Sequence, residues 1–246
     1  MKTPEEITAV PETARAPGGQ STVETVYDAL KDDIISGKRR PGEFLRIDRI
    51  SRAYGVGPTP LRETLQRLTA ESLVIARGGR GFQVAPLTVA EFEDLNIART
   101  AIETAALRLA IEHGAEAWEG RIVAAGYILR KWDQQMLAGA ADAVERWESA
   151  NAEFHTALLS GCPSHWLLHV REGLASKCDR YRRVSVVSAD APYHEDVARE
   201  HMELERAALD RDADRSCALL AGHFQRTVDV FRLQVERGRV DTGADA

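Results

Sequence analysis

The pattern of apolar residues changes at Thr88, and this change most limits what the chain can fold into. From Thr88 to about Arg237 apolar residues recur at helical spacing, without the alternation that is typical of strands. Before Thr88, short helical stretches alternate with short strand-like runs and glycine-rich turns. With 246 residues the chain is long enough for two domains. We therefore expect a small mixed domain followed by an all-α one.

Composition suggests where these domains begin and end. Residues 1–22 hold prolines, glycines and small polar residues without an apolar period, which predicts a disordered tail. We expect the first domain over residues 23–88, the second over 89–237 and a short C-terminal tail over 238–246. No apolar run approaches the ~20 residues that span a bilayer. The N-terminus lacks a secretory signal, so we expect a cytoplasmic protein without a membrane partner.

Residues 23–88 predict three helices and a small hairpin. The apolar spacing indicates helices at about 23–35 and 47–54, and a third that begins near Pro58. Phe44-Leu45 could form a short strand, and Val74–Arg77 and Phe82–Ala85 predict two more around a glycine-rich tip. Three helices with a terminal hairpin make a winged helix-turn-helix.

Charge is divided unevenly along the chain. The net charge of −6 would argue against nucleic acid as a partner. Residues 23–88, however, hold 11 Lys and Arg against 8 Asp and Glu, a net +3, whereas residues 89–246 carry −8. This split suggests that the first domain faces an anion such as DNA.

The third predicted helix has the residues for reading DNA. The N-terminal end of this helix enters the major groove in a helix-turn-helix. Thr59, Arg62 and Gln66 share one face there, and Arg62 can pair with guanine through two hydrogen bonds. Arg62 could instead be a solvated helix charge. Further candidates, for phosphate or minor-groove contacts, are Arg46, Arg49, Arg52 and Arg80.

The run Gly55-Val56-Gly57-Pro58-Thr59-Pro60-Leu61-Arg62-Glu63-Thr64-Leu65, with Pro41-Gly42 before it and Leu68–Val74 after it, resembles the N-terminal domain of GntR-type bacterial transcription regulators. The resemblance implies a homodimer on a palindromic double-stranded DNA operator. One departure stands out. The family usually has Ser or Thr followed by Arg where this chain has Gly57-Pro58. Because Gly is a weaker N-cap and the arginine is missing, we expect a different operator or a lower affinity.

The second domain predicts an antiparallel helical bundle. Helices are expected at about 89–113, 115–136, 142–159, 164–187, 194–209 and 213–237. Thr88 can cap the first of them. Its apolar face is expected to include Phe92, Leu95, Ile97, Ala101 and Leu107.

Three histidines lie on predicted helices of this bundle. His155 follows Asn151 by four residues, so the two share a helix face. His201 and His223 lie about equally far from the turn at Arg211-Asp212, so they should face each other at one height. Three imidazoles with one oxygen ligand suit Zn²⁺ or a similar divalent ion. By spacing alone, these histidines could equally be core or surface groups.

The segments Asn151-x-x-Phe154-His155, Glu200-His201 and His223-Phe224 resemble the FCD effector domain of the FadR subfamily. The resemblance implies a bound divalent metal, Zn²⁺ with Ni²⁺ or Mn²⁺ as alternatives, held by Asn151, His155, His201 and His223. Asn151 stands where the family often has Asp. Arg99 and Glu103 also match a family pattern, and they form either a helix-stabilising ion pair or a binding site for an effector carboxylate through Arg99.

The sequence thus predicts a ligand-responsive transcription regulator, a repressor rather than an enzyme, that senses a small organic acid. Three alternatives remain open. Metal itself could be the signal, three histidines with open metal positions could activate water in an enzyme, or the ligand could be of the acyl-CoA type.

Overall fold

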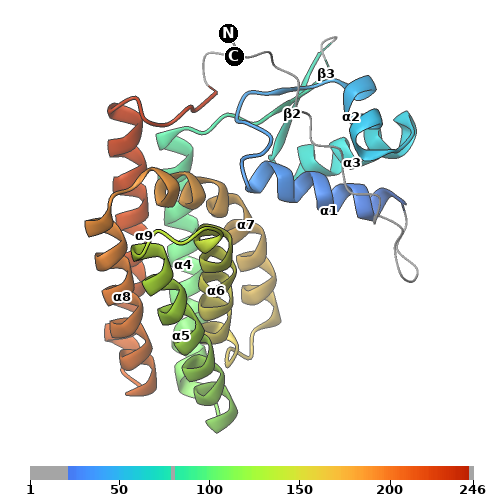
Figure 1. The fold of residues 1–246 in the computed structure, drawn as a ribbon. Coiled ribbons are helices and arrows are strands. Elements are labelled where there is room, and N and C mark those ends of the chain that lie inside the picture. Colours follow the sequence, from blue (N-terminus) through green and yellow to red (C-terminus); the bar gives the residue numbers. More distant parts are fainter. Residues whose placement is uncertain (1–21, 79–80, 244–246) are drawn as a thin grey trace. The chain divides into compact units, whose positions relative to one another are not determined.

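The computed structural model describes residues 22–78 and 81–243, which form two compact units (Figure 1). The described residues up to Leu87 form the first unit, which Thr242 and Gly243 join near the end of the chain. The second unit runs from Thr88 to Asp241. No helix in the described part of the chain is long and apolar enough to cross a membrane.

The first unit is a winged helix-turn-helix, as the sequence predicts. Its elements in order are α1 (Thr22–Ile35), β1 (Phe44–Leu45), α2 (Ile47–Tyr54), α3 (Pro58–Ala70), β2 (Val74–Arg77) and β3 (Gly81–Val84). The strands form an antiparallel sheet in the order β1-β3-β2, with Val74 opposite Val84. Leu30, Leu61, Leu65 and Leu68 are fully buried between the helices.

The turn between α2 and α3 depends on a glycine. Gly55 has a φ of +65°, in the left-handed region that glycine adopts without steric cost. The amide of Val56 then donates to the Ser51 carbonyl and ends α2. Gly57 precedes α3 and offers no side chain to cap it, which matches the expectation from sequence.

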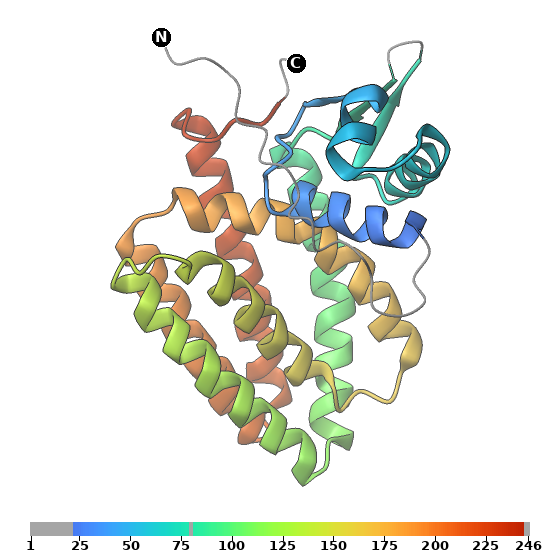
Figure 2. The same ribbon diagram turned by 45° about the vertical axis from the view of Figure 1, so that its right-hand side comes forward.

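The second unit is an all-α bundle, and the predicted fold class is confirmed. Its helices are α4 (Val89–His113), α5 (Glu116–Leu137), α6 (Ala143–Leu159), α7 (His165–Ser188), α8 (Ala191–Leu209) and α9 (Ala213–Glu236). Three of them start at side-chain caps, because Thr88, Ser164 and Asp212 each accept a hydrogen bond from a backbone amide in the first turn. Helix α4 packs between α7 and α9, and α5 packs along α6 and α8 (Figures 1 and 2).

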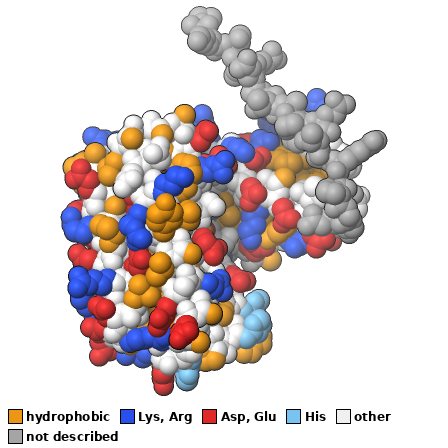
Figure 3. Space-filling model, turned by 60° about the horizontal axis from the view of Figure 1, so that its bottom comes forward, with side chains coloured by type: hydrophobic (Ala, Val, Ile, Leu, Met, Phe, Trp, Pro, Cys, Tyr) orange, Lys and Arg blue, Asp and Glu red, His pale blue; other side chains and the backbone are white. Residues whose placement is uncertain are grey.

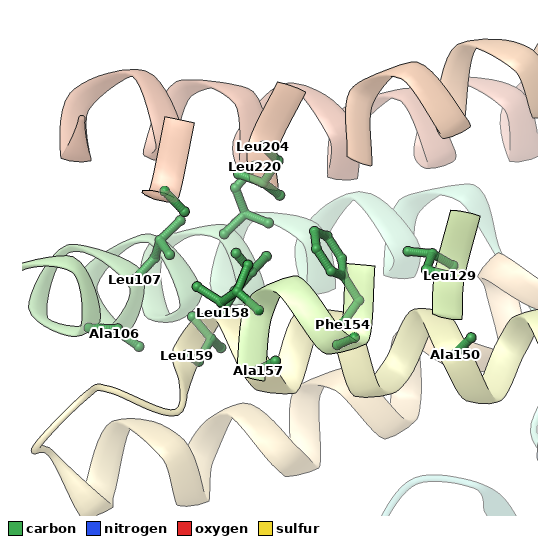
Figure 4. Close-up of a cluster of buried hydrophobic side chains, with 14 of the residues drawn as sticks. Ala106, Leu107, Leu129, Ala150, Phe154, Ala157, Leu158, Leu159, Leu204 and Leu220 are labelled. Carbon is green, nitrogen blue, oxygen red and sulfur yellow. The ribbon is translucent and has the colours of Figure 1, made fainter. Parts of the chain in front are cut away.

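The bundle core is apolar along most of its length. Phe154 and Leu158 of α6 meet Leu129, Leu204 and Leu220 from three other helices (Figure 4). These five side chains are at most 1% exposed. Burial of such side chains contributes roughly 1.5–3 kcal/mol each, so this region stabilises the bundle.

Helix α4 differs from its expected orientation. Ile97, placed on the apolar face by its spacing, is 70% exposed, while Arg99 and Glu103 are buried. The broad apolar stripe did not decide which side faces inward, because the two charged side chains neutralise each other in the interior. Helix α8 also begins earlier than expected, at Ala191, so that only Ala189 and Asp190 connect it to α7.

Candidate functional site

Three histidines meet in the interior of the bundle. His155 comes from α6, His201 from α8 and His223 from α9, and each is at most 6% exposed. One ring nitrogen of each lies within 4.8 Å of the others. The ring centroids are 4.8 Å apart for His201 and His223, and 5.2 Å for His155 and His223. The sequence placed His201 and His223 at one height, and the structure has them so.

Asn151 lies one turn before His155 on the same helix and is 3% exposed. It lines a pocket that is partly open to solvent, together with His155 and His223. Its Oδ1 atom has no hydrogen-bond partner, and neither do Nδ1 of His155 and both ring nitrogens of His201. Buried polar atoms without partners are costly. A cation bound among the three histidines would take one nitrogen of each ring and so satisfy part of this set.

The protonation of the histidines also suits a cation. Burial lowers the pKa of His155 and His201 well below 6.5, and the neighbouring His223 lowers both further. Both rings are therefore neutral near pH 7, the form in which imidazole binds a metal. The residues present fit a divalent cation on these grounds.

His223 has a partner that orients its ring. Its Nδ1 lies 3.0 Å from Oε2 of Glu200, and Glu200 is held in turn by Arg226. Burial raises the pKa of Glu200, but the hydrogen bonds to His223 and Arg226, with the charge of Arg226, outweigh this and lower it overall. An ionised Glu200 accepts the Nδ1 proton, which leaves Nε2 of His223 as the free donor atom.

Arg99 lines the same pocket. Its Nε donates to Oε1 of Glu103 at 2.6 Å, and its guanidinium lies 4.0 Å from the centre of the Phe224 ring. Burial disfavours the charged form, but Glu103 outweighs this and raises the pKa of Arg99. Arg99 is thus both a partner in an ion pair and a buried cation beside the histidines. The two interpretations of the pair from sequence are compatible.

The candidate DNA-binding side chains lie on the outside of the first unit. Thr59, Arg62 and Gln66 are all exposed on α3, opposite its buried leucines. Side chains that read base edges must be free of the protein core, and these three are. Arg46, Arg49 and Arg52 are likewise exposed, before and along α2, whereas Arg80 lies outside the described residues.

Sequence comparison assigns both units to known families. Residues 22–84 match the family described as bacterial regulatory proteins, gntR family, and residues 94–226 match the FCD domain. The chain belongs to the GntR family, with a C-terminal FCD domain.

Relatives of this GntR-family chain are described as regulators. It is 35% identical to the HTH-type transcriptional repressor GlaR of Escherichia coli, over 84% of this chain and 94% of that protein. It is 33% identical to the uncharacterized HTH-type transcriptional regulator BphR of Paraburkholderia xenovorans, over 87% and 86%. The structure of E. coli McbR/YncC has a similar fold, with a TM-score of 0.74 and 19% identity, over 88% of this chain and all of that one. The chain is therefore a DNA-binding transcription regulator.

Several residues at the FCD pocket were not proposed as site residues from the sequence. Cys178 and Arg182 of α7 line it, and Glu200 supports His223. Burial raises the pKa of the Cys178 thiol to about 11. The pair Cys178 and Arg182, at spacing i and i+4, is the one signal that could have indicated a shared inward face.

Proposed function

We propose that this regulator, a repressor, senses a small organic acid through a divalent metal held in its FCD domain. The metal ligands are Asn151, His155, His201 and His223, and Arg99 binds a carboxylate of the effector. Zn²⁺ is the first choice of metal, with Ni²⁺ and Mn²⁺ as alternatives, because imidazole ligands suit all three. The protein acts in the cytoplasm, where its operator lies.

One observation carries this proposal. The buried donor atoms of Asn151, His155 and His201 lack partners, and they come from two helices that converge on His223. Four donors leave open coordination positions on an ion that takes more than four ligands. Such a bound metal would supply a positive charge that attracts a carboxylate.

Arg99 supplies the second contact for the acid. Its planar guanidinium can donate two parallel hydrogen bonds to a carboxylate, and its burial strengthens them. Binding there requires Arg99 to share its donors between the effector and Glu103, whose Oε2 has no hydrogen-bond partner. Glu103 therefore holds Arg99 in place, and α4 carries the contact with the effector.

We further propose that the protein acts as a homodimer on a palindromic operator. Two winged helices related by a two-fold axis match two half-sites. The bundle leaves large hydrophobic side chains exposed that a second copy can cover, among them Ile97 at 70% and Trp166 at 72%. Figure 3 shows hydrophobic side chains among mixed charges on one face of the bundle. Sedimentation of the wild type and of Ile97→Glu tests this, with loss of the dimer expected in the variant.

The test of the sensing function combines metal analysis with operator binding. An operator is selected from random DNA, and fluorescence anisotropy then measures its affinity for protein loaded with Zn²⁺, with and without a panel of organic acids. We expect one metal ion per chain and an acid that weakens operator binding. His223→Ala should lose both the metal and the acid response while it still binds the operator.

Two results would lead to other functions. If Zn²⁺ alone switches operator affinity and no acid changes it, metal is the signal. If neither metal nor acid alters thermal stability or operator affinity, the sensing function is wrong, although DNA binding stands.

A further inference from the structure

Arg182 of α7 is a second buried cation in the FCD pocket, and its position has no role in the function proposed so far. It is 8% exposed and lines the pocket together with Arg99 and the metal-site residues. Its Nη2 atom contacts Glu148 at 2.5 Å and Asp179 at 2.9 Å. Its Nε and Nη1 atoms are buried without hydrogen-bond partners.

Unpartnered donors on a buried guanidinium need an explanation, because each costs more than a neutral donor would. Both protein carboxylates contact Nη2, so they leave the Nε and Nη1 donors available. A protein that needed Arg182 only for structure could satisfy these donors with the same carboxylates in a forked arrangement. The available donors therefore suit an acceptor that enters the pocket.

Arg99 and Arg182 lie beside different members of the histidine triad. The Arg99 guanidinium lies 4.0 Å from the centre of the Phe224 ring, whose centre is 5.7 Å from that of His155. The Arg182 guanidinium lies 5.9 Å from the centre of the Trp147 ring, whose centre is 6.2 Å from that of His201. The two guanidinium groups come from different helices, α4 and α7, and line the same pocket, with Asn151 and His223 lining it as well.

We infer that the effector is a dicarboxylate, with one carboxylate bound by the metal site and Arg99 and the other bound by Nε and Nη1 of Arg182. This inference rests on the proposed sensing function and names its ligand class. Two arginine side chains that line one pocket match a short chain with an acid group at each end. A monocarboxylate would leave the Arg182 donors unsatisfied, and a site built to bind a group discriminates strongly against ligands that lack it.

The experiment compares acids of equal chain length with one or two carboxylates. Straight-chain monoacids and diacids of four to six carbons are titrated by calorimetry into full-length protein loaded with Zn²⁺. We expect at least one diacid to bind about tenfold or more tightly than its monoacid. The diacid should also release operator DNA at a lower concentration.

Variants then assign the preference to Arg182. Arg182→Gln combined with Glu148→Gln removes the cation together with its more buried partner, and the carboxylate that remains, Asp179, is partly exposed to solvent. We expect this double variant to keep its metal and its monoacid affinity, and to bind diacid and monoacid within about twofold of each other. Arg182→Lys keeps the charge but loses the forked donor geometry of the guanidinium. Its preference for diacid over monoacid should lie between those of the wild type and the double variant. Arg183→Gln, on the adjacent residue, is the matched control and should keep the full preference.

The outcomes distinguish the dicarboxylate inference from the proposed acid sensing on which it rests. If monoacids and diacids bind the wild type equally, or if the double variant keeps the preference, the dicarboxylate inference is wrong while metal-dependent acid sensing stands. If no acid binds the metal-loaded protein, both are wrong. A preference that disappears in the double variant and persists in Arg183→Gln supports the inference.

Discussion

The two units bury polar side chains in opposite ways. Among the described residues of the winged unit, the buried polar side chains are Thr64 and Gln83, and the candidate DNA-binding arginines Arg46, Arg49, Arg52 and Arg62 are exposed. The bundle buries Arg99, Glu103, Asp133, Arg182 and three histidines. Both units have an apolar core, so stability alone does not require this difference.

The difference fits the ligands that we propose for the two units. DNA is larger than the domain and is met at the surface, where exposed side chains can reach base edges and phosphates. A small acid can be enclosed, and enclosure in a low-dielectric interior strengthens each charged contact. The net charge of the acidic segment therefore says little about its binding site, since the bundle holds buried cations in its interior.

The largest expected effect is loss of the metal. His223→Ala removes a donor atom of the triad, and we expect metal affinity to fall by more than about 100-fold, because removing even a residue that only supports a ligand costs 10–100-fold. Metal analysis after dialysis and competition with a chelator measure this. Exposed His169 is the matched control, and His169→Ala should keep one metal per chain. An equal metal content in both variants would mean that the triad is not the site.

Arg62→Ala tests whether the exposed face of α3 reads sequence. We expect a loss of about 1–3 kcal/mol in operator binding together with relaxed selectivity at one base pair. Arg49→Ala should instead weaken binding to all DNA and lower the salt dependence by about one phosphate contact. Anisotropy titrations over a range of salt concentrations distinguish the two. Undiminished selectivity in the Arg62 variant would contradict the role given to Arg62.

Glu200→Gln tests how strongly metal affinity depends on the hydrogen bond between Glu200 and His223. The variant keeps the shape of Glu200 but loses the anion that accepts from His223, so we expect metal affinity to fall 10–100-fold. Operator binding without effector should not change, because the substitution lies outside the winged unit. Competition with a chromophoric chelator measures the change. Glu203→Gln, on the same helix, is the control.

Asp133 tests the energetic consequence of a buried charge in the bundle. Burial raises its pKa to about 6, against the hydrogen bond from Trp147. Because the folded-state pKa lies above the unfolded one, its contribution to stability is fully present below about pH 4 and is lost as pH rises through 6. Between pH 5 and 7.5 this loss is about 1.4 kcal/mol. Asp133→Asn should remove that part of the pH dependence in denaturant unfolding, and an unchanged profile would contradict the assignment.

The smallest expected effect concerns Thr242 and Gly243, which belong to the winged unit. The amide of Leu87 donates to the Thr242 carbonyl at 2.9 Å, and Gly243, at a φ of +66°, lies where a Cβ would collide with the Pro41 carbonyl. Gly243→Val should lower the stability of this unit by about 1 kcal/mol, seen as faster exchange of the Leu87 amide. Gly238→Val shares the positive φ but meets no neighbour, so it controls for backbone strain alone.

Local signals in the sequence decided most of the fold. The glycines and prolines around α2 and α3, and the caps at Thr88 and Asp212, act on the backbone within a few residues, so element types and most boundaries could be predicted. The predicted start of α8 lies later in the sequence than the observed one. Pro192 is favoured in the first turn of a helix, but the prediction assigned it to the connection before α8.

The sequence by itself determined the two domains, the winged helix and the histidines that face each other, because turn chemistry and helical period depend on neighbours along the chain. Only the tertiary structure decided which side of α4 faces inward and which cations meet the histidines. Arg99, Cys178 and Arg182 come together through the packing of α4 and α7, whose residues are far apart in the sequence. Burial and charge compensation between helices are collective properties, and no local pattern contains them.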